Sequence, residues 1–170
     1  PPDQRHKPGM ISGRIGRVGA RRYVDLMQRT GVNAVLTRSY GMPWPVRDVQ
    51  GNVVGINTLD FAQMLQRREF DPERDFLVIG VFPEHLKDEW GQDFLGEQWS
   101  RSFVTYLRML SAHVREDLGV PYSRWAVYLE DEGSAGENFI SLGKLTREAD
   151  PKIRIWANPQ GLGELEAAKK

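Results

Sequence analysis

Four short apolar runs alternate with helical patterns along the chain, and this alternation restricts the possible fold more than any other feature. The runs cover residues 32–38, 75–82, 125–130 and 152–157. Their lengths favour strands over helices. Amphipathic spacing predicts the helices, at about 12–30, around Leu59 to Leu65, over 99–118 and over 139–149. Strands that alternate with helices pair in parallel through right-handed crossovers, so the sequence predicts an α/β fold.

The length of the chain narrows the architecture. Its 170 residues suffice for one domain with a core of its own. A parallel sheet of this kind fits either an open doubly wound sheet or part of a (β/α)8 barrel. A whole barrel takes about 250 residues, so four βα units supply about half of one. Without an internal repeat or a dividing linker, we expect a single domain over residues 1–170: alternating βα units that form a partial (β/α)8 TIM barrel.

Composition argues against several classes of function. The 23 basic and 23 acidic residues cancel, whereas a nucleic-acid binder usually has a basic excess. Cysteine is absent, so there is no disulfide framework and no thiolate metal site. His85 near Asp88 and Glu89 lacks the further histidines that zinc sites use. No apolar stretch approaches the ~18 residues of a membrane span. We expect no metal, no other cofactor, no nucleic acid and no membrane.

The third apolar run ends in three consecutive carboxyls. It begins at Trp125 and stops at Glu130, Asp131 and Glu132, and Gly133 follows. Ligand sites in α/β folds lie where the parallel strands end. Crowded carboxyls raise one another's pKa, so one of them tends to hold a proton near neutral pH, which is the state that a general acid needs. The alternative is a set of ordinary loop carboxylates exposed to water.

Aromatic and polar residues gather near the expected strand ends, in part on the two long connections at 39–57 and 83–98. Long loops after strands are where α/β proteins build sites, and Gly51-Asn52 predicts a small hairpin over 49–54. Tryptophans at such positions offer flat apolar faces that suit sugar rings, although each could instead pack in the core or in a lid. The expected substrate contacts are Arg38, Tyr40, Trp44, Trp90, Glu130, Trp156 and Asn158.

The stretch from Trp125 to Gly133, the helix after it and residues 147–156 resemble the middle of glycoside hydrolase family 123 and its uncharacterised barrel relatives. In that family an adjacent Asp-Glu pair ends the fourth barrel strand, and a turn of the type D-P-x-I precedes the next strand. Here the pair is Asp131-Glu132 and the turn is residues 150–153. The likeness is closest over about 124–157 and extends, as an order of elements, back to residue 14. It implies that the four strands are the second to fifth of a barrel.

The resemblance implies substrate-assisted hydrolysis of 2-acetamido sugars of the N-acetylgalactosaminide type. The acetamido oxygen of the substrate attacks the anomeric carbon while Asp131 stabilises the acetamido group. Glu132 protonates the leaving oxygen and later activates water. Because neighbouring strand residues point to opposite faces, the two carboxyls converge only if the strand ends or bulges at Glu130. The implied partner is a glycan with N-acetylhexosamine, and the implied location is secreted or periplasmic, although no signal peptide is visible.

Other functions remain open from the sequence. One is a two-carboxylate glycosidase in which Glu130 or Glu132 is the acid and its partner lies on a later strand. Another is a non-catalytic carbohydrate-binding or structural piece of a barrel, because Gly133 stands where the family commonly has proline. The chain begins at Pro1 and looks trimmed, and four strands leave open sheet edges, which are prone to association. We therefore expect the rest of the barrel in the parent polypeptide, or self-association.

Overall fold

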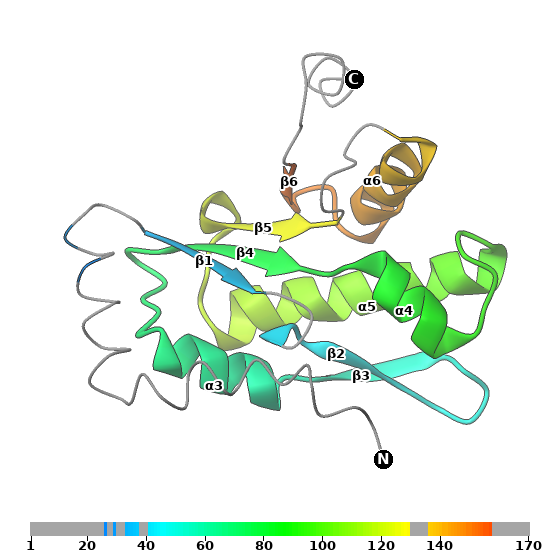
Figure 1. The fold of residues 1–170 in the computed structure, drawn as a ribbon, viewed down its shortest axis with the longest axis horizontal. Coiled ribbons are helices and arrows are strands. Elements are labelled where there is room, and N and C mark those ends of the chain that lie inside the picture. The colour runs from blue at the N-terminus through cyan, green and yellow to red at the C-terminus, as the bar shows by residue number, and fades with distance from the viewer. Residues whose placement is uncertain (1–25, 27–28, 30–32, 38–40, 130–135, 158–170) are drawn as a thin grey trace. The chain divides into compact units, whose positions relative to one another are not determined.

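A computed structural model describes residues 26, 29, 33–37, 41–129 and 136–157, apart from the side chains of residues 84 and 85 (Figure 1). The chain divides into two compact units, Pro1–Asn33 and Ala34–Lys170. Leu26 and Arg29 in the first unit are helical, but the rest of the helix predicted at about 12–30 lies outside the described residues. The single domain over 1–170 stays a prediction. Both sheets and helices α3 to α6 belong to the second unit.

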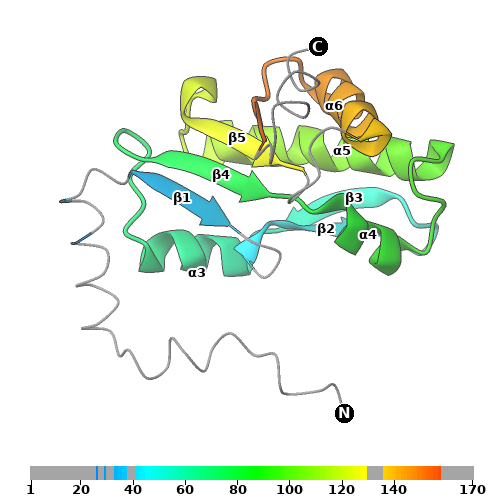
Figure 2. The same ribbon diagram turned by 45° about the horizontal axis from the view of Figure 1, so that its top comes forward.

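The main sheet confirms the predicted α/β fold. Its strands are β1 (Ala34–Thr37), β4 (Phe76–Gly80), β5 (Trp125–Tyr128) and β6 (Ile155–Trp156). Each lies inside one of the four predicted apolar runs and is shorter than that run. The strands stand in the order β1-β4-β5-β6, and each pairs in parallel with the next, as Figure 2 shows for β1, β4 and β5.

A second, two-stranded sheet follows β1 and contains the predicted hairpin. Strands β2 (Trp44–Arg47) and β3 (Val53–Asn57) pair antiparallel around a turn over residues 48–52. The Asp48 carboxylate accepts hydrogen bonds from the backbone N–H of Gln50 at 3.0 Å and of Asn52 at 2.8 Å. Hydrogen bonds from the side chain and backbone of Asn52 hold the pKa of Asp48 below its ordinary value. Gly51 takes the left-handed conformation (φ +85°) that this turn needs.

Helices connect the parallel strands. They are α3 (Leu59–Arg67), α4 (Pro83–Trp90), α5 (Glu97–Ala112) and α6 (Glu137–Ala149). A π-helical turn at His113–Asp117 extends α5 toward the predicted end at 118, and a 3-10 turn at Tyr122–Arg124 leads into β5. Helix α4 corrects the expectation that 83–98 is a loop. It begins with Pro83 at its first turn and ends at Gly91, whose φ is +58°.

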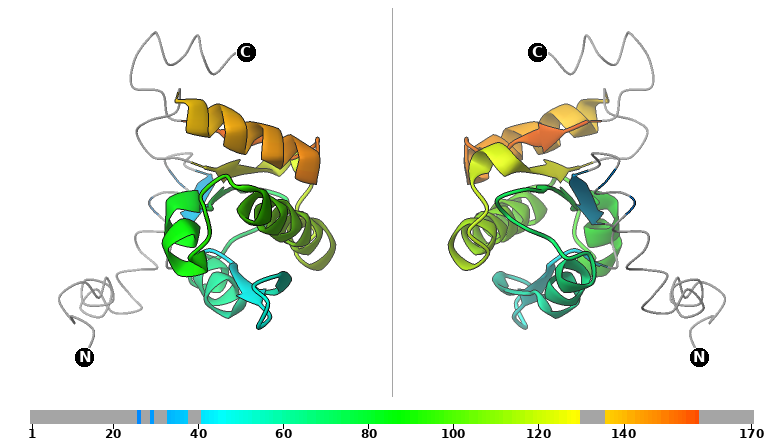
Figure 3. Two further views of the ribbon diagram at one scale, coloured as in Figure 1. Left: turned by 90° about the vertical axis from the view of Figure 1, so that its right-hand side faces the viewer. Right: turned by 90° about the vertical axis from the view of Figure 1, so that its left-hand side faces the viewer.

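The core lies between the main sheet and α5. Leu77, Ile79 and Val127 from the strands belong to one buried cluster with Phe103 and Leu107 of α5. Helix α5 also lies between the hairpin and α6, as Figure 3 shows. Strand residues alternate between the two faces of a sheet. Val78, Ala126 and Tyr128, which alternate with these core residues, therefore point to the opposite face. The described helices contain no segment with the length and apolarity that crossing a bilayer needs.

Arginine side chains link the amino-terminal ends of the parallel strands. Arg124, just before β5, donates to the backbone oxygen of Arg74 at 2.9 Å, and Arg154, just before β6, donates to that of Ser123 at 2.9 Å. Asp75, just before β4, is buried and receives two hydrogen bonds of 2.8 Å from Arg74. Burial raises the pKa of Asp75, but the hydrogen bonds outweigh it and hold this pKa below its ordinary value.

Candidate functional site

Most of the residues expected at the site lie outside the described part of the chain. These are Arg38, Tyr40, Glu130, Asp131, Glu132 and Asn158. The structure places Trp44, Trp90 and Trp156, together with the residues that immediately precede the acidic cluster. The site can therefore be built from the carboxyl-terminal ends of β4, β5 and β6.

Three strands end in register at this edge. Tyr128, the last residue of β5, pairs with Gly80 of β4 on one side and with Trp156 of β6 on the other. The backbone oxygen of Tyr128 also accepts a hydrogen bond of 3.0 Å from the N–H of Val81. Leu129 is buried, and Glu130 is the next residue in the chain. The acidic cluster thus begins two residues beyond a fixed point on the central one of these three strands.

Three aromatic rings form a row along this edge, which we call the aromatic ledge: Phe82, Tyr128 and Trp156. The ring centroids of Phe82 and Tyr128 lie 5.9 Å apart at an interplanar angle of 71°, and those of Tyr128 and Trp156 lie 4.8 Å apart at 73°. Such edge-to-face pairs are favourable because the positive edge of one ring meets the negative face of the other. Tyr128 is 3% exposed, whereas Trp156 is 40% exposed. The ledge therefore has a buried centre and an accessible outer ring.

Of the three ledge residues, the sequence pattern indicated Trp156 but not Tyr128 or Phe82. The continuous apolar run from Trp125 to Leu129 does not show which residues share a face, so it did not single out Tyr128. Phe82 gave no signal either. Its backbone is left-handed (φ 43°, ψ 73°), and strand periodicity does not predict this conformation.

The backbone at Phe82 is strained, and the strain positions its ring. A non-glycine residue in such a conformation costs about 1–3 kcal/mol and persists only where the surroundings enforce it. Here Pro83 begins α4 directly afterwards, and the ring folds back over Gly80. A Cβ added at Gly80 would lie 2.4 Å from Cε2 of Phe82 and 2.6 Å from the backbone oxygen of Thr37.

The other two expected tryptophans occupy packing positions. Trp90, at the end of α4, is 5% exposed, and its ring centroid lies 5.6 Å from that of Trp99. The Arg47 guanidinium lies 5.6 Å from the Trp90 ring and donates to the Trp90 backbone oxygen at 3.1 Å. Trp44 is half-buried in β2 and packs against the core. Neither position supports a substrate contact, and that role stays a prediction for both.

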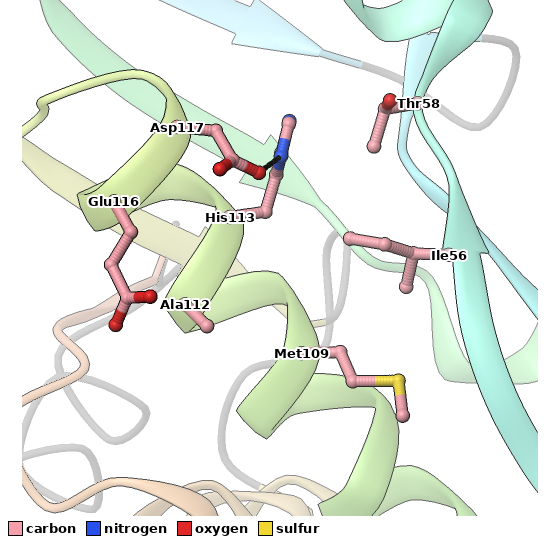
Figure 4. Close-up of a pocket in the computed structure, with 7 residues that line it drawn as sticks. All are labelled: Ile56, Thr58, Met109, Ala112, His113, Glu116 and Asp117. Carbon is pink, nitrogen blue, oxygen red and sulfur yellow. Dashed lines mark hydrogen bonds and ion pairs between the residues drawn. The ribbon is translucent and has the colours of Figure 1, made fainter.

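A separate pocket of about 360 Å³ lies among β3, the start of α3 and the π-helical turn (Figure 4). Its lining residues are Ile56, Thr58, Met109, Ala112, His113, Glu116 and Asp117. His113 Nδ1 lies 2.6 Å from a carboxylate oxygen of Asp117, while Glu116 extends away from the imidazole. This pair resembles the His-Asp part of a hydrolytic triad.

The rest of this pocket does not support catalysis. Nε2 of His113 is buried and has no hydrogen-bond partner among the described residues. A general base must reach the proton that it takes, directly or through one water, and a buried Nε2 does not offer that reach. In the described part of the chain, no group of three or more histidine, aspartate or glutamate side chains is placed to hold a metal ion. The carboxyl-terminal edge of the sheet is the stronger candidate site.

Comparisons of the chain with protein-family models and with curated proteins return no match.

Proposed function

We propose that this chain is a glycosidase-type piece of a (β/α)8 barrel, acting on 2-acetamido sugars at the carboxyl-terminal edge of the parallel sheet. The order of the strands supports the barrel. Doubly wound sheets reverse their strand order at a switch point, whereas each strand of a barrel pairs with the next one in sequence. The four strands of the main sheet follow the second pattern, β1-β4-β5-β6.

The observation that carries the functional proposal is the placement of Trp156 beside the strand that leads into the acidic cluster. Tyr128 and Trp156 are paired across β5 and β6, and Glu130, Asp131 and Glu132 follow Tyr128 after one further residue. An accessible indole offers the apolar face of a sugar ring a surface to stack on, and carboxyls supply acid-base chemistry. The proposed stacking surface thus lies beside the strand that the acidic residues follow in the chain.

The proposed reaction needs one adjacent pair of carboxyls. The acetamido oxygen of the substrate forms a bond to the anomeric carbon as the glycosidic carbon–oxygen bond breaks, and Glu132 gives its proton to the leaving oxygen. Asp131 stabilises the positive charge that develops on the acetamido group. Glu132 then takes a proton from a water molecule whose oxygen attacks the anomeric carbon, which releases the acetamido oxygen. The net change is hydrolysis, and both carboxyls return to their starting states.

Hydrolysis of a nitrophenyl N-acetylgalactosaminide by the full chain tests this proposal. Glu132→Gln removes the proton donor, so kcat should fall by about 10²–10⁴-fold, the usual contribution of general acid-base catalysis. Glu137→Gln, at the exposed first turn of α6, is the matched control and should leave the rate unchanged. Full activity in Glu132→Gln would contradict the proposal. Activity on sugars that lack the acetamido group would instead favour the two-carboxylate mechanism.

Non-catalytic carbohydrate binding is the second candidate function. The exposure of Trp156 favours it, because stacking needs no carboxyl. Quenching of tryptophan fluorescence by sugars without any turnover would select this function over hydrolysis.

We propose the remaining strands of a barrel, or a second copy of the chain, as the partner of this sheet. Within the described strands, β1 and β6 each pair on one side only, and unpaired edges promote association. Light scattering of the isolated chain should therefore show self-association. A soluble monomer would contradict this part of the proposal.

A further inference from the structure

We infer that the aromatic ledge is a rigid subsite for a neutral pyranose ring, in which Trp156 stacks on the sugar and Tyr128 and Phe82 are positioning residues. The inference deepens the proposed function and rests on it for the class of ligand. It adds two residues that the sequence did not indicate, and it concerns binding rather than bond cleavage.

The outer ring of the ledge has surface left for a ligand. Trp156 is 40% exposed although its centroid lies only 4.8 Å from that of Tyr128. At an interplanar angle of 73°, the two rings touch through an edge of one of them, which occupies a small area. The exposed 40% of Trp156 therefore remains available to a ligand. The C–H bonds on one face of a pyranose carry slight positive charge and match the negative face of an aromatic ring.

The inner rings fix the position of Trp156. Tyr128 is nearly fully buried and lies at the end of a central strand. On its other side, the Phe82 ring is held by a left-handed backbone and by the close approach to Gly80. A binding surface that is already ordered loses less conformational entropy when the ligand arrives. The ledge is therefore preorganised.

The ledge favours a neutral sugar. Phe82, Tyr128 and Trp156 carry no charge, so the ledge itself offers no cation to pair with the carboxylate of a uronic acid. The negative face of an aromatic ring also disfavours an anion. Neutral hexoses and N-acetylhexosamines are therefore the preferred ligands.

Titration of the full chain with N-acetylgalactosamine tests the inference, in a Glu132→Gln background so that binding is measured without turnover. Trp156→Ala should weaken binding about tenfold or more, since an aromatic contact and its buried area together exceed the 1.4 kcal/mol that corresponds to a factor of ten. Ile140→Ala, which removes a similarly exposed apolar side chain (46%) from α6, is the control and should leave the affinity unchanged. Glucuronic acid should bind more weakly than the neutral sugar.

Two further pairs of variants separate positioning from simple stability. Tyr128→Phe and Phe82→Tyr keep the ring and should retain binding, whereas Tyr128→Leu and Phe82→Leu should weaken it while the chain stays folded by circular dichroism. An unchanged affinity in Trp156→Ala, or no sugar binding at millimolar concentration in the parent chain, overturns the inference.

The two proposals fail in different ways. Binding that depends on Trp156, without hydrolysis by the unmodified chain, removes the catalytic proposal and keeps the subsite. Hydrolysis that is lost in Glu132→Gln but keeps its KM in Trp156→Ala removes the subsite and keeps the catalytic proposal.

Discussion

The ring of Phe82 lies against Gly80 so closely that no side chain fits at position 80. A Cβ there would stand 2.4 Å from Cε2 of the ring, well inside van der Waals contact. The last residue of β4 must therefore be glycine for the ring of Phe82 to turn back over the sheet and reach Tyr128. A residue without a side chain thus determines where an aromatic one can lie.

Gly80→Ala should destabilise the protein by about 1–3 kcal/mol, the usual effect of forcing extra volume into a packed site. The backbone oxygen of Thr37, 2.6 Å from the added carbon, cannot rotate away. Gly143→Ala in α6 is the matched control, because its Cβ would meet Ile155 at an ordinary 3.7 Å. The control should gain about 0.5–1 kcal/mol from helix propensity. Urea unfolding measures both, and equal effects would show that the ring yields easily.

Because of Asp150, the free energy of unfolding of the protein should fall in acid. Burial raises its pKa, but hydrogen bonds from the Tyr122 hydroxyl, the Lys152 N–H (2.9 Å) and the Ser111 hydroxyl (2.7 Å) hold its pKa below the ordinary value. A carboxyl with a depressed folded pKa contributes stability above its unfolded pKa, about 3.9, and loses it as pH falls through the folded value. Asp150→Asn should therefore be destabilising at pH 7, and the difference from the parent should shrink below about pH 4. A constant difference across this range would contradict the assignment.

Tyr106→Phe should lower the free energy of unfolding by about 1–3 kcal/mol, because it leaves a buried carbonyl without its donor. The Tyr106 hydroxyl is fully buried and donates to the backbone oxygen of Pro43 at 2.7 Å. Burial also raises the pKa of this hydroxyl, so it stays protonated and the effect should be the same at pH 6 and pH 9. Thermal unfolding at the two pH values measures this, and a loss that depends on pH would argue for another cause.

Neutral His113 should carry its proton on Nδ1. An ionised carboxylate only accepts hydrogen bonds, so the 2.6 Å contact with Asp117 requires the donor to be Nδ1. Nitrogen NMR of the imidazole should then show a protonated Nδ1 and an unprotonated Nε2 in the neutral form. Asp117→Ala should abolish this preference. If Nε2 carries the proton in the neutral form of the parent chain, the prediction is wrong and the contact forms only with the charged imidazole.

The sequence predicted β4 and β5 well because their apolar runs are buried. Trp125 to Leu129 is a continuous buried stretch, and a run of this kind is readable without knowing its neighbours. The helix at 83–90 was missed because it has eight residues, is mostly polar, and begins after the left-handed Phe82. The sequence placed Trp90 at the rim of the candidate site because it did not predict α4. Without that helix, the packing of Trp90 against Trp99 could not be predicted.

The sequence predicted a site at the strand ends but did not indicate that Tyr128 lies beside Trp156 there. Consecutive apolar residues do not reveal which of them share a face, so Tyr128 was read as part of a core strand. Its partnership with Trp156 depends on the register between β5 and β6, which is a property of the sheet and not of either segment. The strain at Phe82 depends likewise on Gly80 and on the start of α4.

The arginine links of Arg124 and Arg154 have a consequence for how this fold can change over time. They hold the beginnings of neighbouring strands through side-chain bonds to backbone oxygens, which depend little on the identity of the residues that supply the oxygens. Strand spacing is then maintained from the end remote from the ledge. Loops at the opposite edge are free to diverge in sequence and length, so new ligand preferences can evolve there while the scaffold is inherited intact.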